Sequence, residues 1–191
     1  MKELSIINAG YLGSTLSDYG NFEEKLRINQ PIEAKNFNVK SVYYDDSYSI
    51  SVILSFANKS VKIPADLGAN VSDDIISWME AICMGYEESM LLLDLEGYYT
   101  MLRFYSHFKD IPRFTIISAN GKFFDKKKKE IIYHYKTQIV CDIFISKKKF
   151  VQQLWNAIQN ALKLTPDKDY EEINANPPIR NSEIIKRFLE K

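Results

Sequence analysis

Two acidic side chains, Asp94 and Glu96, stand two positions apart in the apolar segment LLLDLEGYY at residues 91–99. On a β-strand this spacing places both carboxylates on one face, which is the arrangement that metal or acid–base sites use. However, Glu96 falls in a predicted tight turn with Gly97, and Tyr99 or Arg103 across the hairpin could pair with Asp94. Carboxylates at a hairpin tip are usually solvated, so we interpret this pair as a surface feature rather than a catalytic pair.

The other side chains that could do chemistry are sparse. His107 and His134 have no second histidine or cysteine within one helical turn, so a zinc site would need ligands from distant segments. Cys83 and Cys141 lack C-x-x-C spacing and are typical of buried, reduced thiols. The sequence therefore predicts no catalytic constellation, no metal site and no cofactor.

The stretch SIINAGYLGST at residues 5–15 approaches the dinucleotide-binding pattern G-x-G-x-x-G. Asn8 stands where the first glycine belongs, and residues 14–20 lack the helical pattern that should follow. No second strand ending in an acidic residue comes about 20 positions later, as that fold requires. We interpret Asn8, Gly10 and Gly13 as loop residues after an N-terminal strand that pairs with the edge of a sheet.

Charge argues against nucleic acid as the partner. Lysine plus arginine and aspartate plus glutamate each total 25 of the 191 residues, so the chain has no net basic field to attract phosphates. Two lysine runs, at 126–129 and 147–149, could form a local patch, but they are most simply solvated. No apolar stretch approaches a membrane span, and the N-terminus does not resemble a signal peptide, so we expect a cytoplasmic protein.

Hydrophobic periodicity predicts the elements that would position these side chains. Amphipathic helices are expected at residues 72–86 and 147–164, where apolar residues recur on one face after the N-cap residues Ser72 and Ser146. A weaker helix is expected near 21–26, ahead of Pro31. Strands are predicted at residues 39–44, 48–56, 60–63, 90–95, 98–105, 113–118, 131–135 and 138–145.

These elements indicate an α+β fold. We expect a mainly antiparallel sheet of about six to eight strands, packed by two amphipathic helices. Residues 1–165 would form a single domain. Residues 166–191 would form a polar linker and a short C-terminal helix at 182–189, which could dock on the domain or on a partner.

Aromatic residues are abundant, with twelve tyrosines and eleven phenylalanines. Several gather around the hairpin at 90–105, more than one buried face can hold. Tyrosine buries area at protein interfaces while keeping a polar tip, so we predict a protein-contact surface here. A sheet covered on both faces is the alternative. The predicted surface comprises Asp94, Glu96, Tyr98, Tyr99, Arg103 and Tyr105.

The order of elements over residues 38–164 resembles that of small bacterial cytoplasmic proteins, some of which are immunity proteins of polymorphic and contact-dependent toxin systems. The segments that carry this resemblance are YSISVILSF, SVKI, DDIISWMEAICMGY, LLLDLEGYYTMLRFY, RFTIIS and CDIFISKKKFVQQLWNAI. The resemblance implies a non-enzymatic protein that binds a toxin domain and blocks its active site. The leading hypothesis is therefore a non-catalytic protein-binding module.

Two other hypotheses remain open. An enzyme could assemble a site from dispersed residues around the hairpin, with Asp94, Glu96, Arg103 and His107 as candidates. A structural or assembly subunit could instead use the C-terminal helix to dock on a neighbour.

Overall fold

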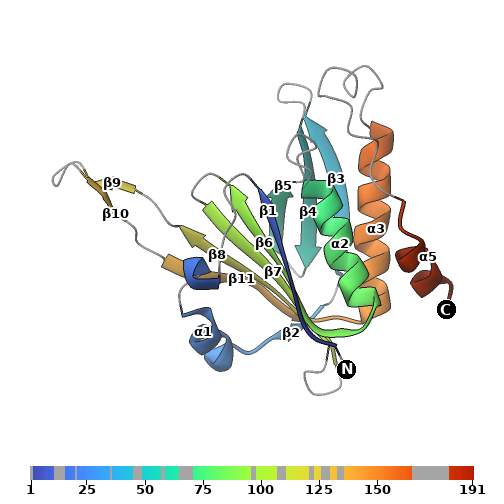
Figure 1. Cartoon of the computed structure of the whole chain (residues 1–191), viewed down its shortest axis with the longest axis horizontal. Coiled ribbons are helices and arrows are strands. Elements are labelled where there is room, and N and C mark those ends of the chain that lie inside the picture. Colours follow the sequence, from blue (N-terminus) through green and yellow to red (C-terminus); the bar gives the residue numbers. More distant parts are fainter. Residues whose placement is uncertain are drawn as a thin grey trace.

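The computed structural model describes residues 2–10, 16–19, 21–34, 36–44, 49–56, 59–64, 71–95, 98–106, 111–120, 123–125, 130–132, 136–164 and 181–191. It confirms the α+β class (Figure 1). The strands are β1 (Lys2–Gly10), β2 (Ile32–Glu33), β3 (Asn38–Tyr44), β4 (Ser49–Phe56), β5 (Lys59–Pro64), β6 (Tyr86–Leu95), β7 (Tyr98–Tyr105), β8 (Arg113–Asn120), β9 (Phe123–Asp125), β10 (Glu130–Ile132) and β11 (Lys136–Phe144). The helices are the 3-10 helix η1 (Leu16–Tyr19), α1 (Phe22–Ile28), α2 (Val71–Cys83), α3 (Lys147–Leu164) and α5 (Glu183–Glu190).

A six-stranded mixed sheet forms the centre, in the order β1-β6-β7-β8-β11-β2. Strands β6, β7, β8 and β11 are antiparallel neighbours, whereas β1 and β2 add to the two edges in parallel. The expectation that an N-terminal strand pairs with the sheet edge is thus confirmed. The interpretation of Asn8 and Gly10 as loop residues was wrong, because both pair with β6 as part of β1, and Gly13 lies outside the described residues. The predicted meander of residues 39–63 forms a separate sheet, β3-β4-β5, and β9 pairs with β10.

One face of the central sheet holds the main core. Helices α2 and α3 lie side by side against this face, and α3 also packs along β3 (Figure 1). Leu91, Leu93 and Phe104 point into this layer because alternate residues of a strand face opposite sides. The ring of Phe150 on α3 lies 4.6 Å from Phe114 and 5.0 Å from Phe104, between ring centroids.

The opposite face is covered over only part of its area. Tyr19 of η1 and Phe22 and Leu26 of α1 pack against a second apolar cluster that includes Met101 and Ile117. The Thr137 hydroxyl donates to the carbonyl of Tyr19 over 2.6 Å, which ties η1 to β11. Among the described helices, none covers the β1 side of this face (Figure 1).

The helix ends follow the expected local chemistry. The Ser146 hydroxyl accepts from the Lys149 backbone amide, and the Ser182 hydroxyl accepts from that of Ile185, so both serines cap the helices that follow them. Helix α2 begins at Val71, one residue before the predicted cap. Gly85 adopts φ +81° in the turn that leads from α2 into β6, a conformation that favours glycine.

The C-terminal helix docks on the domain. Ile185 is fully buried, and Phe188 and Leu189 pack against the main core beside α2 and α3 (Figure 1). The Ser182 hydroxyl also donates to the Glu80 carboxylate over 2.7 Å. The polar linker expected before this helix, residues 166–178, lies outside the described residues.

Two predicted boundaries were wrong: helix α2 ends at Cys83 rather than at 86, and strand β6 begins before 90. Strand β6 begins at Tyr86 rather than at 90, because the polar segment 86–89 pairs with both β1 and β7 and its Glu88 binds Arg103 of β7. The strand expected at 131–135 is described only over β10, whose partner β9 was not predicted. Among the described helices, none is long and apolar enough to cross a membrane.

Candidate functional site

Two residues of the predicted contact surface are buried. Asp94 and Tyr99 are opposite each other in the β6–β7 ladder, and their exposed fractions are 1% and 7%. The packing of η1 causes this burial, since the ring of Tyr19 meets that of Tyr99 at 6.1 Å. Neither carboxylate oxygen of Asp94 has a hydrogen-bond partner in the described part of the chain. The expectation of a solvated carboxylate at the hairpin tip was therefore wrong for Asp94.

Arg103 does not pair with Asp94, as the sequence had suggested. Its guanidinium binds Glu88, the diagonal neighbour across the β6–β7 pair, and reaches Glu23 of α1 at 3.4 Å. Arg103 is opposite Met90, four positions from Asp94 along β6, which corresponds to roughly 13 Å. The two side chains therefore cannot share a dispersed catalytic site.

The remaining predicted residues are only partly described. Tyr105 is half-buried and lines the pocket described below. Tyr98 belongs to β7 by its backbone, but its side chain lies outside the described part of the structure. Glu96, His107, His134 and the lysine run at 126–129 also lie outside the described residues.

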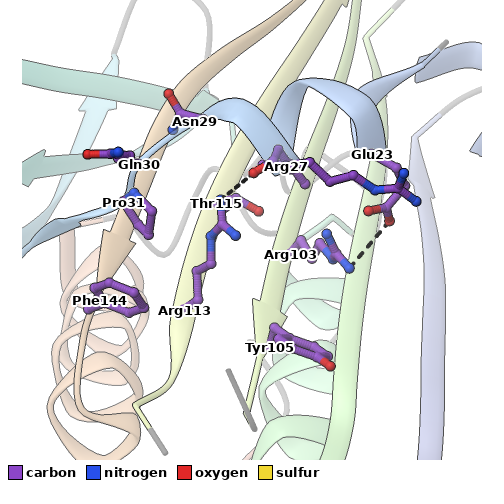
Figure 2. Close-up of a pocket in the computed structure, with 11 residues that line it drawn as sticks. Glu23, Arg27, Asn29, Gln30, Pro31, Arg103, Tyr105, Arg113, Thr115 and Phe144 are labelled. Atoms are coloured by element: carbon purple, nitrogen blue, oxygen red, sulfur yellow. Dashed lines mark hydrogen bonds and ion pairs between the residues drawn. The ribbon is translucent and has the colours of Figure 1, made fainter. Parts of the chain in front are cut away.

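A pocket of about 650 Å³ opens below α1, on the partly covered face of the central sheet (Figure 2). Strands β7, β8 and β11 form its floor, and α1 with the segment that follows forms its roof. Three arginines from three different elements line it, together with one carboxylate and an apolar wall. The lining residues are Glu23, Leu26, Arg27, Asn29, Gln30, Pro31, Arg103, Tyr105, Arg113, Thr115 and Phe144.

A buried ion pair fixes the floor of this pocket. Arg113 of β8 donates two hydrogen bonds to Asp142 of β11, from Nε over 2.7 Å and from Nη2 over 2.6 Å. The same guanidinium donates to the carbonyl of Leu26 (Figure 2). The Asn29 amide also donates to Asp142. The pair thus links β8 and β11 to α1 and fixes the distance between this helix and the sheet.

A β-bulge makes this ion pair possible. The β8–β11 register shifts between Ile139 and Cys141, so that Asp142 becomes the partner of Thr115. Without the extra residue, strict alternation would turn Cys141 toward α1 and Asp142 toward the apolar core. The bulge therefore delivers the carboxylate to the pocket side.

One polar group of the pocket has no partner. The Thr115 side chain is 1% exposed, and its hydroxyl makes no hydrogen bond with any described residue. By contrast, Arg27 lies exposed on α1 and has no ion pair within the described ranges. Leu26, Pro31 and Phe144 supply apolar surface between these polar groups (Figure 2).

The edge strand β1 offers a second feature. On its α1 side, Leu4 and Ile6 are 46% and 41% exposed. A shallow hollow beside Leu4 is lined by Glu3, Glu87, Glu88 and Tyr105. Because Tyr105 lines both this hollow and the pocket, the uncovered surface runs continuously from β1 to the arginines.

The sequence-based prediction missed Arg113, Thr115 and Arg27. A signal for the first two was present, because the strand RFTIIS carries polar residues at alternate positions beside apolar ones. Such alternation indicates that one face of the strand is not part of an apolar core. No comparable signal pointed to Arg27, whose position depends on where α1 crosses the sheet.

The cysteines do not form a reactive site. Both are free; burial raises the pKa of the Cys83 thiol to about 12, and burial, followed by the charge of Asp142, raises that of Cys141 further. The run at 147–149 begins at the half-buried Lys147, whose pKa burial lowers. In the described ranges, no group of three or more histidine, cysteine, aspartate or glutamate side chains could hold a metal ion. None of the protein families, curated proteins and solved structures compared with the chain matches it.

Proposed function

We propose that this chain is a non-catalytic protein-binding module that docks its partner on strand β1 and the surface beside it. The proposal rests on the outer side of β1, which is an open edge of the described sheet. Strand β1 spans nine residues, and among the described strands it has a hydrogen-bonded neighbour on one side only, β6. The backbone groups on its other side are therefore free to pair with a strand from another protein.

The sequence of β1 lacks the usual protection of an edge. Sheet edges in natural proteins are commonly blunted by charged residues, proline or a bulge. Here the charged residues Lys2 and Glu3 stand at one end, and residues 4–9 (LSIINA) carry no charge and no proline. Leu4 and Ile6 add exposed apolar area, so a partner strand would gain both ladder hydrogen bonds and side-chain burial.

The surface next to β1 has the composition of a protein interface. Tyrosine and arginine are the residues that most often dominate binding energy, and here Tyr105 and Arg103 stand behind Leu4 and Glu88. Asp94 and Tyr99 are buried and take no part in this version of the contact surface. The proposal thus moves the expected interface from the hairpin tip to the sheet edge.

For the partner, we infer a toxin domain, with this chain acting as its immunity protein in the cytoplasm. The resemblance in the order of elements over residues 38–164 supports this class of partner. The balanced charge of the chain is compatible with a contact made by strand pairing and apolar burial rather than by bulk electrostatic attraction.

The experiment is a paired binding and rescue assay. A toxin module encoded directly upstream of this gene would be expressed with and without the chain, and growth and co-purification would be measured. We expect a one-to-one complex and restored growth. We expect the Ile6→Thr variant to weaken binding about tenfold, because a threonine keeps strand propensity but loses apolar area.

Ile32→Thr is the matched control, since Ile32 is an exposed isoleucine on the opposite edge strand of the same sheet. Docking on β1 would be contradicted if both variants weakened binding equally, or if neither variant weakened it. Restored growth without a physical complex would contradict the protein-binding function itself.

A further inference from the structure

We propose that the pocket below α1 binds a carboxylate group carried on an apolar body. This site adjoins the proposed docking surface and shares Arg103 and Tyr105 with it, but no residue of β1 itself lines the pocket. Its volume of about 650 Å³ suits a small ligand or the end of a peptide side chain.

The hydroxyl of Thr115 is the first argument for a ligand. A buried hydroxyl without a partner costs free energy, and native structures rarely leave one unpaired. Thr115 lines the pocket and lies opposite Asp142 in the β8–β11 ladder. A ligand oxygen in the pocket would accept its hydrogen bond.

The rigidity of Arg113 is the second argument. Two hydrogen bonds to Asp142 and one to the carbonyl of Leu26 hold its guanidinium in place before any ligand arrives. A donor group that is already ordered loses little entropy on binding. Because Asp142 and Leu26 already take the Nε and Nη2 hydrogens, Arg113 contributes an ordered charge beside the ligand rather than a bidentate grip on it.

Glu23 identifies where the ligand carboxylate would lie. The Arg103 guanidinium binds Glu88 closely, but its contact with Glu23 is long, at 3.4 Å, and the Glu23 side chain is 50% exposed (Figure 2). Exposed ion pairs of this kind are weak. The Glu23 carboxylate therefore stands in for a ligand carboxylate and can swing away when one binds.

The charges of the pocket residues indicate the net charge of the ligand. With Glu23 displaced, the pocket and its paired residues hold three arginines against two carboxylates, Glu88 and Asp142, which leaves one positive charge in excess. One negative charge balances this site, so a carboxylate fits better than a doubly charged phosphate. The apolar surface of Leu26, Pro31 and Phe144 would contact the body of the ligand.

The test is a titration of the ¹⁵N-labelled full chain followed by NMR. The first probe is 3-phenylpropionate, and 3-phenylpropionamide, which has the same shape without the charge, is its control. We expect shifts at the amides of Arg113, Thr115 and Phe144 with a dissociation constant of about 1 mM, typical of a fragment. The proposal would be overturned if these backbone amides did not shift, or if 3-phenylpropionamide bound as tightly as 3-phenylpropionate.

A second titration tests whether the carboxylate belongs to a protein chain or to a free small molecule. The capped peptide acetyl-Phe-Glu-amide presents the same chemistry as part of a protein chain. Tighter binding of the peptide would assign the pocket to a protein partner, and tighter binding of 3-phenylpropionate would assign it to a free metabolite. Either result supports a carboxylate site.

Three variants test the named groups. Glu23→Gln should raise carboxylate affinity several-fold, because it removes the competing charge from an exposed position where folding is not at risk. Arg103→Gln should lower affinity about tenfold, and Thr115→Val should lower it to a similar extent. Arg187→Gln, an exposed arginine on α5, is the matched control. An unchanged or reduced affinity in Glu23→Gln would refute the role assigned to Glu23 and the charge argument with it.

Discussion

The ion pair between Arg113 and Asp142 gives the sharpest stability prediction. Both residues are more than nine-tenths buried, and two short hydrogen bonds join them. Removing one partner from such a pair leaves an uncompensated buried charge, which costs about 3–5 kcal/mol. We therefore expect Arg113→Met and Asp142→Asn each to lower the free energy of unfolding by about that amount.

The double variant Arg113→Met/Asp142→Asn should behave differently. With both charges gone, neither is left unpaired, so we expect the loss to be within about 2 kcal/mol of the wild type. The coupling energy of the cycle, the sum of the single losses minus the double loss, should then be at least about 3 kcal/mol.

The assay is equilibrium unfolding in urea, followed by the fluorescence of Trp78 and Trp155, which both lie in the main core. Stability should be read from the midpoint at a constant denaturant slope. Single losses below about 1 kcal/mol, or losses that simply add in the double variant, would refute the inference that the pair is desolvated and mutually dependent.

Other features give further expectations. Gly85→Ala should lower the free energy of unfolding by about 1 kcal/mol, because an added Cβ meets nothing within 4 Å and only the φ of +81° disfavours it. Gly85→Asn should lower it less, since asparagine tolerates positive φ, and equal losses for the two variants in urea unfolding would contradict this. Asp94→Asn should raise the free energy of unfolding by about 1 kcal/mol or more, since it replaces a buried carboxylate that has no hydrogen-bond partner among the described residues, and a loss in the same assay would show that a partner exists. Cys83 and Cys141 should react with a disulfide reagent at pH 8 only after unfolding, because a pKa of about 12 against 9.0 lowers the thiolate fraction of Cys83 about a thousandfold. Between pH 9.0 and about 12 the native state keeps the Cys83 proton that the unfolded state loses, so stability falls as pH rises through this window, and Cys83→Ala should flatten that fall.

Local patterns predicted much of the fold. Helix α3 spans the predicted residues 147–164, because its apolar stripe and the Ser146 cap are both encoded within one segment. The β3-β4-β5 meander and the short C-terminal helix follow from alternation and capping in the same way. These features need no knowledge of distant parts of the chain.

The site depends on contacts between distant segments, which local patterns do not contain. Asp94 is buried because η1, more than 70 residues earlier in the chain, packs over the hairpin. Asp142 reaches the pocket only through the bulge in β11, and a one-residue change in register would turn it into the core. The exposure of Leu4 and Ile6 likewise follows from the placement of β1 at an edge, where no other described strand lies beside it.

Hydrogen–deuterium exchange of the chain, alone and with the proposed toxin partner, tests the proposed docking of a protein on β1 most directly. If a partner strand pairs with β1, backbone amides in residues 4–9 should exchange more slowly in the complex, whereas those of β2 at the opposite edge should be unchanged. A stable complex in which residues 4–9 exchange as fast as in the free chain would contradict this account.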